Sequence, residues 1–390
     1  MSGPDARTPP EPGGEHPGRH LDAAAGLPLH PVARAALAAA ADEGWADPRQ
    51  PYLAGRRARL LLDAARESVA QSLGARPEEI VFAPNATMAR HAAVLGALAG
   101  NARGGNGFVH SAVEHSAILH AATHAGRPVT VPVDALARVD AAGFAHAASA
   151  PGVVAAALQA ANHEVGTRQP VDEVRDGLAG AVPLVVDAGV SAGQDDLPSG
   201  WDVLIADART WGGPTLGVLA IRTGVRWRSP LPEDEGERGR MPGGPDVPAA
   251  VAAAAALRAV LADRVAEDAR RRAMVERIRT TVAATVPDVE VLGDPVDRVP
   301  HVVTFSCLYV DGEALLAELD RLGFAVSSGS SCTSSSLEPS HVLVAMGALT
   351  SGNVRVSLPA GVREAVVDDF LRVLPGAVAT VRAGLGAAGL

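Results

Sequence analysis

Four polar residues whose side chains can do chemistry each follow a short apolar run of the chain. They are Thr87 after IVF, His115 after FVH, Asn162 after VVAAAL and Asp187 at the end of PLVVD. A helix that begins near the hydroxyl of Thr87 offers free backbone N–H groups to an anion, although an ordinary capped helix has the same residues. A carboxylate that ends an apolar strand either serves a function or caps the next loop, and for Asp187 we favour a function.

The most distinctive stretch is SSGSSCTSSSLEPSHVLVAMG, residues 327–347, which we call the cysteine segment. Its Cys332 lies among Ser and Gly without apolar neighbours, so we expect an exposed and reactive thiol. Cys307, within VVTFSCLYV, has the surroundings of a buried structural cysteine. Arg355, in the following run VRVSL, can offer a bidentate guanidinium fork to a carboxylate.

Lysine is absent from the whole chain. The 34 residues counted as Lys or Arg are all arginine. A guanidinium forms no Schiff base and does not act as a tunable amine base, so chemistry that depends on a lysine side chain is excluded.

Composition and charge also exclude several classes of partner. The formal net charge is −10, and no basic run is interleaved with aromatic residues, which argues against nucleic acid or an anionic membrane as the main partner. Two cysteines cannot form a disulfide framework, and no secretory or membrane-spanning apolar run occurs, so we expect a reduced protein of the cytoplasm. His120 and His124 are one helical turn apart but lack a third ligand at a suitable spacing, and we expect no metal site.

The elements that must position these residues follow from the apolar pattern. Short apolar runs alternate with helical stretches from about residue 31, and we expect six of these runs to be strands, at 80–82, 108–110, 153–158, 183–187, 203–206 and 216–221. This pattern predicts an α/β fold with a mainly parallel sheet covered on both faces. Ligands of such folds bind at the carboxyl ends of the strands. The predicted organisation is a disordered tail at 1–19, a large domain at 20–260 and a smaller C-terminal α/β domain at 261–390 that carries the cysteine segment. In the smaller domain we expect strands near 289–292, 302–307 and 325–327.

Taken together, these residues resemble the cysteine desulfurases, which are class V aminotransferase-fold enzymes that use pyridoxal phosphate (PLP). The resemblance extends over residues 20–375 and rests on HLDAAAGLPLH, NATMARHAAVLGAL, SAVEHSAIL, NHEVGTRQP, VDAGVSAGQ and the cysteine segment. It implies a PLP-transferase fold of type I, L-cysteine as substrate, a sulfur-acceptor protein as partner and a homodimer.

The resemblance also implies a role for individual side chains. Thr87 would bind the cofactor phosphate, His115 would stack on the pyridine ring, Asp187 would pair with the ring nitrogen, Asn162 would lie near the ring oxygen, Cys332 would take sulfur from the substrate as a persulfide, and Arg355 would hold the substrate carboxylate.

Departures from the family pattern are concentrated at the cofactor. The family pattern Ser-x-His-Lys corresponds here to the segment 207–210, in which Thr210 stands at the Schiff-base lysine. Asp207 occupies the position of the family's phosphate-binding serine, where a carboxylate would repel the phosphate. Val190 occupies the position of a glutamine that in the family pattern is expected to hydrogen-bond the ring oxygen. Covalent PLP is therefore excluded, and ordinary PLP catalysis by this chain alone is disfavoured.

A missing pyridinium would leave Asp187 as a buried carboxylate in need of a cation. We expect Arg209 to turn into the vacated site and pair with Asp187 or Asp207, with Trp211 nearby.

Three functions remain open. In the first, the chain is a divergent sulfur-transfer enzyme with PLP bound non-covalently. In the second, it is a non-catalytic relative that accepts a persulfide on Cys332 from a true desulfurase, or that regulates this desulfurase in a mixed dimer. The third is a PLP-free enzyme whose different ligand is held by Arg209 and Arg355.

Overall fold

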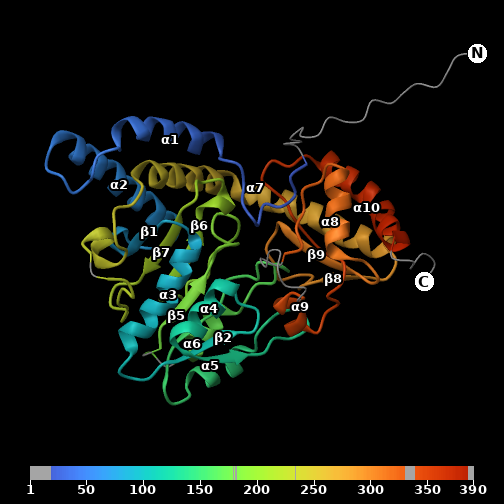
Figure 1. The fold of residues 1–390 in the computed structure, drawn as a ribbon, viewed down its shortest axis with the longest axis horizontal. Helices are drawn as coiled ribbons and strands as arrows, with labels where there is room; N and C mark the ends of the chain where they lie inside the picture. The colour runs from blue at the N-terminus through green and yellow to red at the C-terminus, as the bar shows by residue number, and fades with distance from the viewer. Residues whose placement is uncertain (1–18, 179, 181, 233, 330–338, 385–390) are drawn as a thin grey trace, which may run out of the picture.

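A mainly parallel sheet forms the larger part of the molecule, as predicted. The computed structural model describes residues 19–178, 180, 182–232, 234–329 and 339–384 (Figure 1). Within these residues, seven strands form one sheet in the order β1-β7-β6-β5-β4-β2-β3. Their bounds are β1 Ile80–Ala83, β2 Gly107–Ser111, β3 Arg127–Val131, β4 Val153–Ala157, β5 Leu184–Asp187, β6 Val203–Asp207 and β7 Gly217–Ile221. Strand β7 is antiparallel to both of its neighbours, and the other pairs are parallel.

The strand β3 has no counterpart in the apolar runs of the sequence. It reads RPVTV, lies at the edge of the sheet beside β2, and exposes most of its side chains. An edge strand does not need the continuous apolar pattern by which the six buried strands were recognised.

Helices cover both faces of this sheet. One face packs against α1 (Pro31–Glu43), α2 (Leu53–Ser72), α5 (Ala141–Ala148), α6 (Val171–Gly177) and α7 (Val247–Thr285), and the other against α3 (Ala86–Asn101) and α4 (Ser116–Ala125). Side chains alternate between the faces along each strand, so Val186 joins the first apolar core while Val185 joins the second. Short 3-10 turns are η1 (Pro77–Glu79), η2 (Ala208–Trp211) and η3 (Gly236–Gly239).

A smaller antiparallel sheet has the order β10-β9-β8 and its own apolar core. Its strands are β8 (Val289–Leu292), β9 (Val302–Cys307) and β10 (Asn353–Ser357), and α8 (Gly312–Arg321) and α10 (Glu364–Gly384) pack into its core. The helix α9 (His341–Met346) packs in a separate apolar cluster that includes Val113 and Leu292. The third strand expected here, at 325–327, was wrong, because Ala325 and Ser327 form only isolated bridges with His20 and Arg355.

The 39-residue helix α7 connects the two sheets, as Figure 1 shows. Its first half supplies Ala253 to the core of the large sheet, and its second half supplies Ile278 to the core of the small one. The boundary predicted at residue 260 falls inside this continuous helix and stays a prediction. The tail predicted at 1–19 lies, apart from Arg19, outside the described residues.

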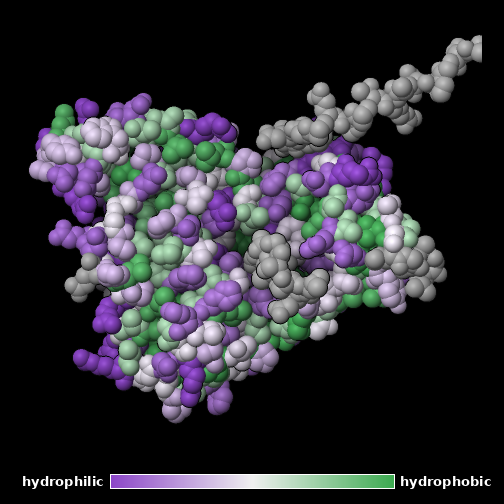
Figure 2. All heavy atoms as spheres, viewed as in Figure 1, coloured by the Kyte–Doolittle hydropathy of each residue, from purple (hydrophilic) through white to green (hydrophobic). Residues whose placement is uncertain are grey.

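The surface mixes residue types. On the face shown in Figure 2, hydrophilic and hydrophobic residues are interspersed over both sheets and their helices. Among the helices that the structure describes, none has the length and apolar character needed to cross a bilayer.

Candidate functional site

The carboxyl ends of adjacent parallel strands bring several of the expected residues together. Strands β4, β5 and β6 run parallel side by side, so their carboxyl ends share one edge of the sheet. Asp187 is the last residue of β5, and Asp207 is the last residue of β6. Two carboxylates therefore lie at neighbouring strand ends and require compensation where water is excluded.

A buried ion pair neutralises Asp187, and its partner is a residue without an expected role. Arg90, in the second turn of α3, donates from Nε to Oδ2 at 2.6 Å and from Nη2 to Oδ1 at 3.2 Å. The backbone N–H of Gly189 donates to Oδ1 at 2.9 Å. Both carboxylate oxygens are thus occupied by donors of the chain itself.

The second carboxylate pairs with the arginine that the sequence singled out. Arg209 donates from Nη2 to Oδ2 of Asp207 at 3.1 Å, so the expected pair is present. The expectation that Arg209 fills the interior was wrong, since its side chain is 49% exposed. Arg209 is only two positions from Asp207, so the two side chains pair at the rim of the site. The cation at Asp187 is already provided by Arg90 of α3.

The residue at the expected lysine position is bound within its own turn. The hydroxyl of Thr210 is buried and donates to the backbone carbonyl of Asp207 at 2.8 Å, and Gln194 Nε2 donates to the carbonyl of Thr210 at 2.6 Å. Trp211 is fully buried beside it, and its indole N–H donates to Ala253. These contacts make η2 a packed structural turn.

Three further positions of the family's cofactor site are Thr87, Asn162 and Val190. Asn85 begins α3, as its side chain accepts from the N–H of Met88, and Thr87 lies exposed in the first turn. The amide of Asn162 accepts from two backbone N–H groups and donates to the carbonyl of Val113 at 3.1 Å, so the turn after β4 uses the whole side chain. Val190 lies in a small buried apolar cluster.

Two imidazoles lie in contact near Arg90. His115 begins α4, and its Nδ1 accepts from the N–H of Ala117. Its ring centroid is 5.1 Å from that of His163. Burial and the nearby Arg90 charge lower the pKa of His115 to about 2, and burial followed by the neighbouring imidazole and guanidinium lowers the pKa of His163 well below its usual value. Both rings are therefore neutral at physiological pH.

Glu114 is a buried acid beside this histidine. Its Oε1 accepts from the hydroxyl of Ser111 at 2.9 Å and from the N–H of Gln159 at 3.0 Å. Its Oε2 has no hydrogen-bond partner among the described residues. Burial raises the pKa of Glu114 to about 8, so the carboxyl group carries a proton at neutral pH.

Arg355 reaches the same region from β10 of the smaller sheet. It donates from Nη2 to Asp22 at 2.8 Å and from Nη1 to the carbonyl of His163 at 3.0 Å, while its buried Nε lacks a partner among the described residues. The substrate-carboxylate role that the resemblance implies for Arg355 stays a prediction.

Glu164 contacts both flanks of the central part of the cysteine segment. On the far flank, Ser340 Oγ donates to Glu164 Oε2 at 2.6 Å. On the near flank, Gly329 has a φ of 77°, and a Cβ there would lie 3.3 Å from Glu164 Cγ and 3.5 Å from Arg355 Cβ. Burial raises the pKa of Glu164 to about 7. Cys332 lies between these flanks and outside the described residues.

The other cysteine is the structural one that the sequence predicts. Cys307 ends β9 in the core of the smaller sheet and is completely buried. Burial raises the pKa of its thiol to about 11, so the nucleophilic thiolate is scarce at neutral pH.

Arg90 and Glu164 are the residues that sequence reasoning missed. Arg90 left a signal, since it stands in the apolar run ATMARHAAVLGAL with no acid three or four positions away. An arginine in that position is either exposed or paired across the fold. Glu164 left a weaker signal, since it follows the apolar run VVAAAL, but its contacts come from segments far away in the chain.

The residues present at the family's cofactor position do not fit PLP. Asp187 already binds Arg90, Asp207 presents a carboxylate, and Thr210 uses its hydroxyl within η2. With no lysine in the chain, a Schiff base cannot form here.

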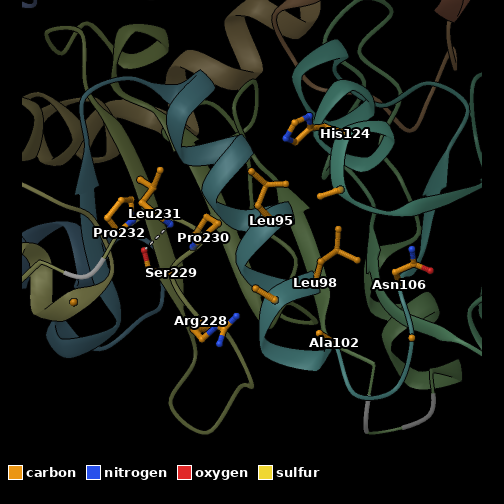
Figure 3. Close-up of a pocket in the computed structure, with 14 residues that line it drawn as sticks. Leu95, Leu98, Ala102, Asn106, His124, Arg228, Ser229, Pro230, Leu231 and Pro232 are labelled. Carbon is orange, nitrogen blue, oxygen red and sulfur yellow. Dashed lines mark hydrogen bonds between the residues drawn. The ribbon is translucent and has the colours of Figure 1, made fainter.

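A separate cavity of about 800 Å³ lies along α3, away from these residues. Figure 3 shows Leu95 and Leu98 of α3 between the segment 228–232 and the residues Asn106 and His124. None of the candidate site residues lines it.

Comparisons with known proteins agree with the fold and with the residue pattern. Residues 20–370 match the family model for class V aminotransferases. An IscS-like cysteine desulfurase of Mycobacterium tuberculosis is 36% identical, over 95% of this chain and 99% of that protein. Cysteine desulfurase 2 of Trichormus variabilis is 33% identical, over 87% of this chain and 88% of its own length.

Solved structures show the same architecture. A NifS-like protein superposes with a TM-score of 0.84 at 23% identity, over 92% of this chain and 98% of that one. Together with the sequence relatives, this means that the chain belongs to the class V aminotransferase family and is a cysteine desulfurase-like member of it.

Proposed function

We propose that this chain takes part in sulfur mobilisation as a PLP-independent sulfur carrier, which accepts sulfur as a persulfide on Cys332. The observation that carries the proposal is that the chain retains the cysteine segment but contains no lysine. Cysteine desulfurase relatives support a sulfur-handling role. Thr210, at the family's lysine position, cannot hold the cofactor, so a sulfur donor outside this chain is required.

The proposed step balances without an oxidant or a reductant. The Cys332 thiolate attacks the outer sulfur of a donor persulfide, and a new S–S bond forms at Cys332. The S–S bond of the donor breaks, and the donor leaves as a thiolate that takes up a proton. Passing the sulfur to an acceptor thiol repeats the same exchange.

Contacts at the flanks of the cysteine segment support this role. Glu164 and Arg355 lie against Gly329, and Ser340 is hydrogen-bonded to Glu164. We propose that these side chains position the segment, which is a task that does not require a cofactor. His115 lies next to His163 and is neutral, but a pKa of about 2 makes it too weak a base to take the proton of a thiol, so we assign it no proton transfer in this exchange.

The partners and setting complete the proposal. This chain would act with two partners. One is the persulfide donor, a true desulfurase supplied with L-cysteine, and the other is a sulfur-acceptor protein. We propose a homodimer, or a mixed dimer with the desulfurase, in the cytoplasm, where thiols stay reduced.

The test is sulfur loading of the full-length chain. The chain is incubated with L-cysteine and PLP alone, or with an active cysteine desulfurase added, and Cys332 is examined by mass spectrometry after thiol trapping. We expect one added sulfur on Cys332 only when the desulfurase is present. The matched variants are Cys332→Ser, which should abolish loading, and Cys307→Ser, which should leave it unchanged.

Two results would contradict the proposal. Release of sulfide or loading of Cys332 from L-cysteine by this chain alone would make it a lysine-independent desulfurase. Failure to load in the presence of the active desulfurase would remove the carrier role.

A further inference from the structure

The ion pair between Arg90 and Asp187 lies where the resemblance implies a cofactor cation. Both side chains are nearly enclosed, with 9% of Arg90 and 6% of Asp187 exposed. The guanidinium meets the carboxylate through two N–H groups, at 2.6 Å and 3.2 Å. A bidentate pair of this kind is both oriented and strong.

The backbone after β5 leaves room for this guanidinium. A Cβ placed on Gly189 would lie 2.3 Å from Arg90 Nη2 and 3.0 Å from Asp187 Oδ1. Any other residue at 189 would require Arg90 Nη2 to move, so the glycine leaves room for the pair in this geometry.

Surrounding acids keep Arg90 in place. Burial alone would disfavour its charge, but the charge and hydrogen bonds of Asp187, with a smaller contribution from Asp207, raise the pKa of Arg90 above its ordinary value. Arg90 is therefore always a cation at this position. A pyridinium nitrogen would supply a cation here only while the cofactor is bound.

We propose that Arg90 is an internal replacement for the cofactor cation and excludes PLP from this site. Its guanidinium is bound to the Asp187 carboxylate with which the ring nitrogen would have to pair. A second cation cannot be placed between Arg90 and Asp187. The inference concerns this end of the site alone and does not rest on sulfur transfer at Cys332.

The experiment asks whether removing Arg90 reopens the site. Asp207→Ser and Thr210→Lys are combined in the full-length chain, which removes the repelling carboxylate and provides the missing amine. PLP is then titrated into this double variant with and without Arg90→Asn. The dissociation constant is read from visible absorbance, and borohydride reduction followed by peptide mass spectrometry locates the cofactor.

We expect PLP to bind at least about tenfold more tightly when Arg90 is replaced, with the cofactor attached to the introduced lysine. The matched control replaces Arg209 by Asn in the same double variant, and it should not tighten binding, because Arg209 does not contact Asp187. Circular dichroism checks the fold of each variant, and Arg90→Gln serves if the asparagine variant does not fold.

Equal affinity with and without Arg90, or no attached cofactor in either protein, would overturn the proposal, because Arg90 would not be what excludes PLP. Sulfur loading of Cys332 is measured separately and can fail without affecting this result.

Discussion

The two ends of the candidate site differ in how their polar groups are satisfied. At the ends of β5 and β6, Asp187 and Asp207 are paired by arginines of the chain itself. Toward the cysteine segment, Glu114 Oε2, His163 Nε2 and Arg355 Nε are buried and have no hydrogen-bond partner among the described residues. The carboxylates at the first end are satisfied by the folded framework, whereas the second end presents buried polar atoms that no described residue satisfies.

The largest effect expected from this comparison is at Arg90. Arg90→Met leaves Asp187 as an uncompensated buried charge and should lower the free energy of unfolding by about 3 to 5 kcal/mol. Urea denaturation measures the change. Adding Asp187→Asn should recover most of the loss, because the amide oxygen still accepts from Gly189. A loss that Asp187→Asn does not reverse would mean that Arg90 stabilises the protein by packing.

The next effect is a dependence of stability on pH at Glu114. Its pKa rises from the ordinary 4.5 to about 8 on folding, so the folded state holds a proton that the unfolded state releases between these values. The free energy of unfolding should therefore fall as pH rises through this window, by about 2 to 3 kcal/mol between about pH 5.5 and pH 7.5.

Glu114→Gln provides the control for this pH dependence. The amide keeps an acceptor for Ser111 and Gln159 but does not titrate. The variant should show a flatter profile of urea stability against pH than the unsubstituted chain. Parallel profiles would show that Glu114 is ionised in the folded protein. Glu164, whose pKa is raised to about 7, adds a smaller change of the same sign.

A smaller loss is expected at the flank of the cysteine segment. Ser340→Ala removes the hydrogen bond to Glu164 and the cap of α9, where the hydroxyl accepts from Val342. Stability in urea should fall by about 1 to 2 kcal/mol. Ser72→Ala is the matched control, because that hydroxyl bonds only a carbonyl of its own helix. Equal effects of the two substitutions would deny Ser340 a special role.

The smallest effect should be at Arg209. Its pair with Asp207 is half-exposed, and such pairs contribute about 0 to 1 kcal/mol. Arg209→Met should therefore change the urea midpoint far less than Arg90→Met. A loss as large as that of Arg90→Met would remove the contrast between the interior and the rim of the site.

Much of the fold could be predicted, because its strands are continuous apolar runs. The six buried strands of the large sheet were recognised in this way, and strand β3 was not, because its exposed edge position leaves no such pattern. The expected strand at 325–327 was wrong, since sequence does not show whether a neighbouring strand extends alongside. Asn162 lies in the turn after β4, beyond the apolar run that it was expected to follow, and its bonding to that turn depends on backbone geometry.

The sequence by itself determined that no Schiff base can form, since lysine is absent, and that a carboxylate, Asp187, ends an apolar strand. Only the tertiary structure decided which arginine neutralises which carboxylate. Arg209 is two positions from Asp207 and pairs with it at the rim, whereas Arg90 is 97 positions from Asp187 and reaches it because α3 packs across one face of the sheet. Long-range ion pairs depend on the packing of helices against strands. A local pattern of residues does not show which side chains this packing brings together.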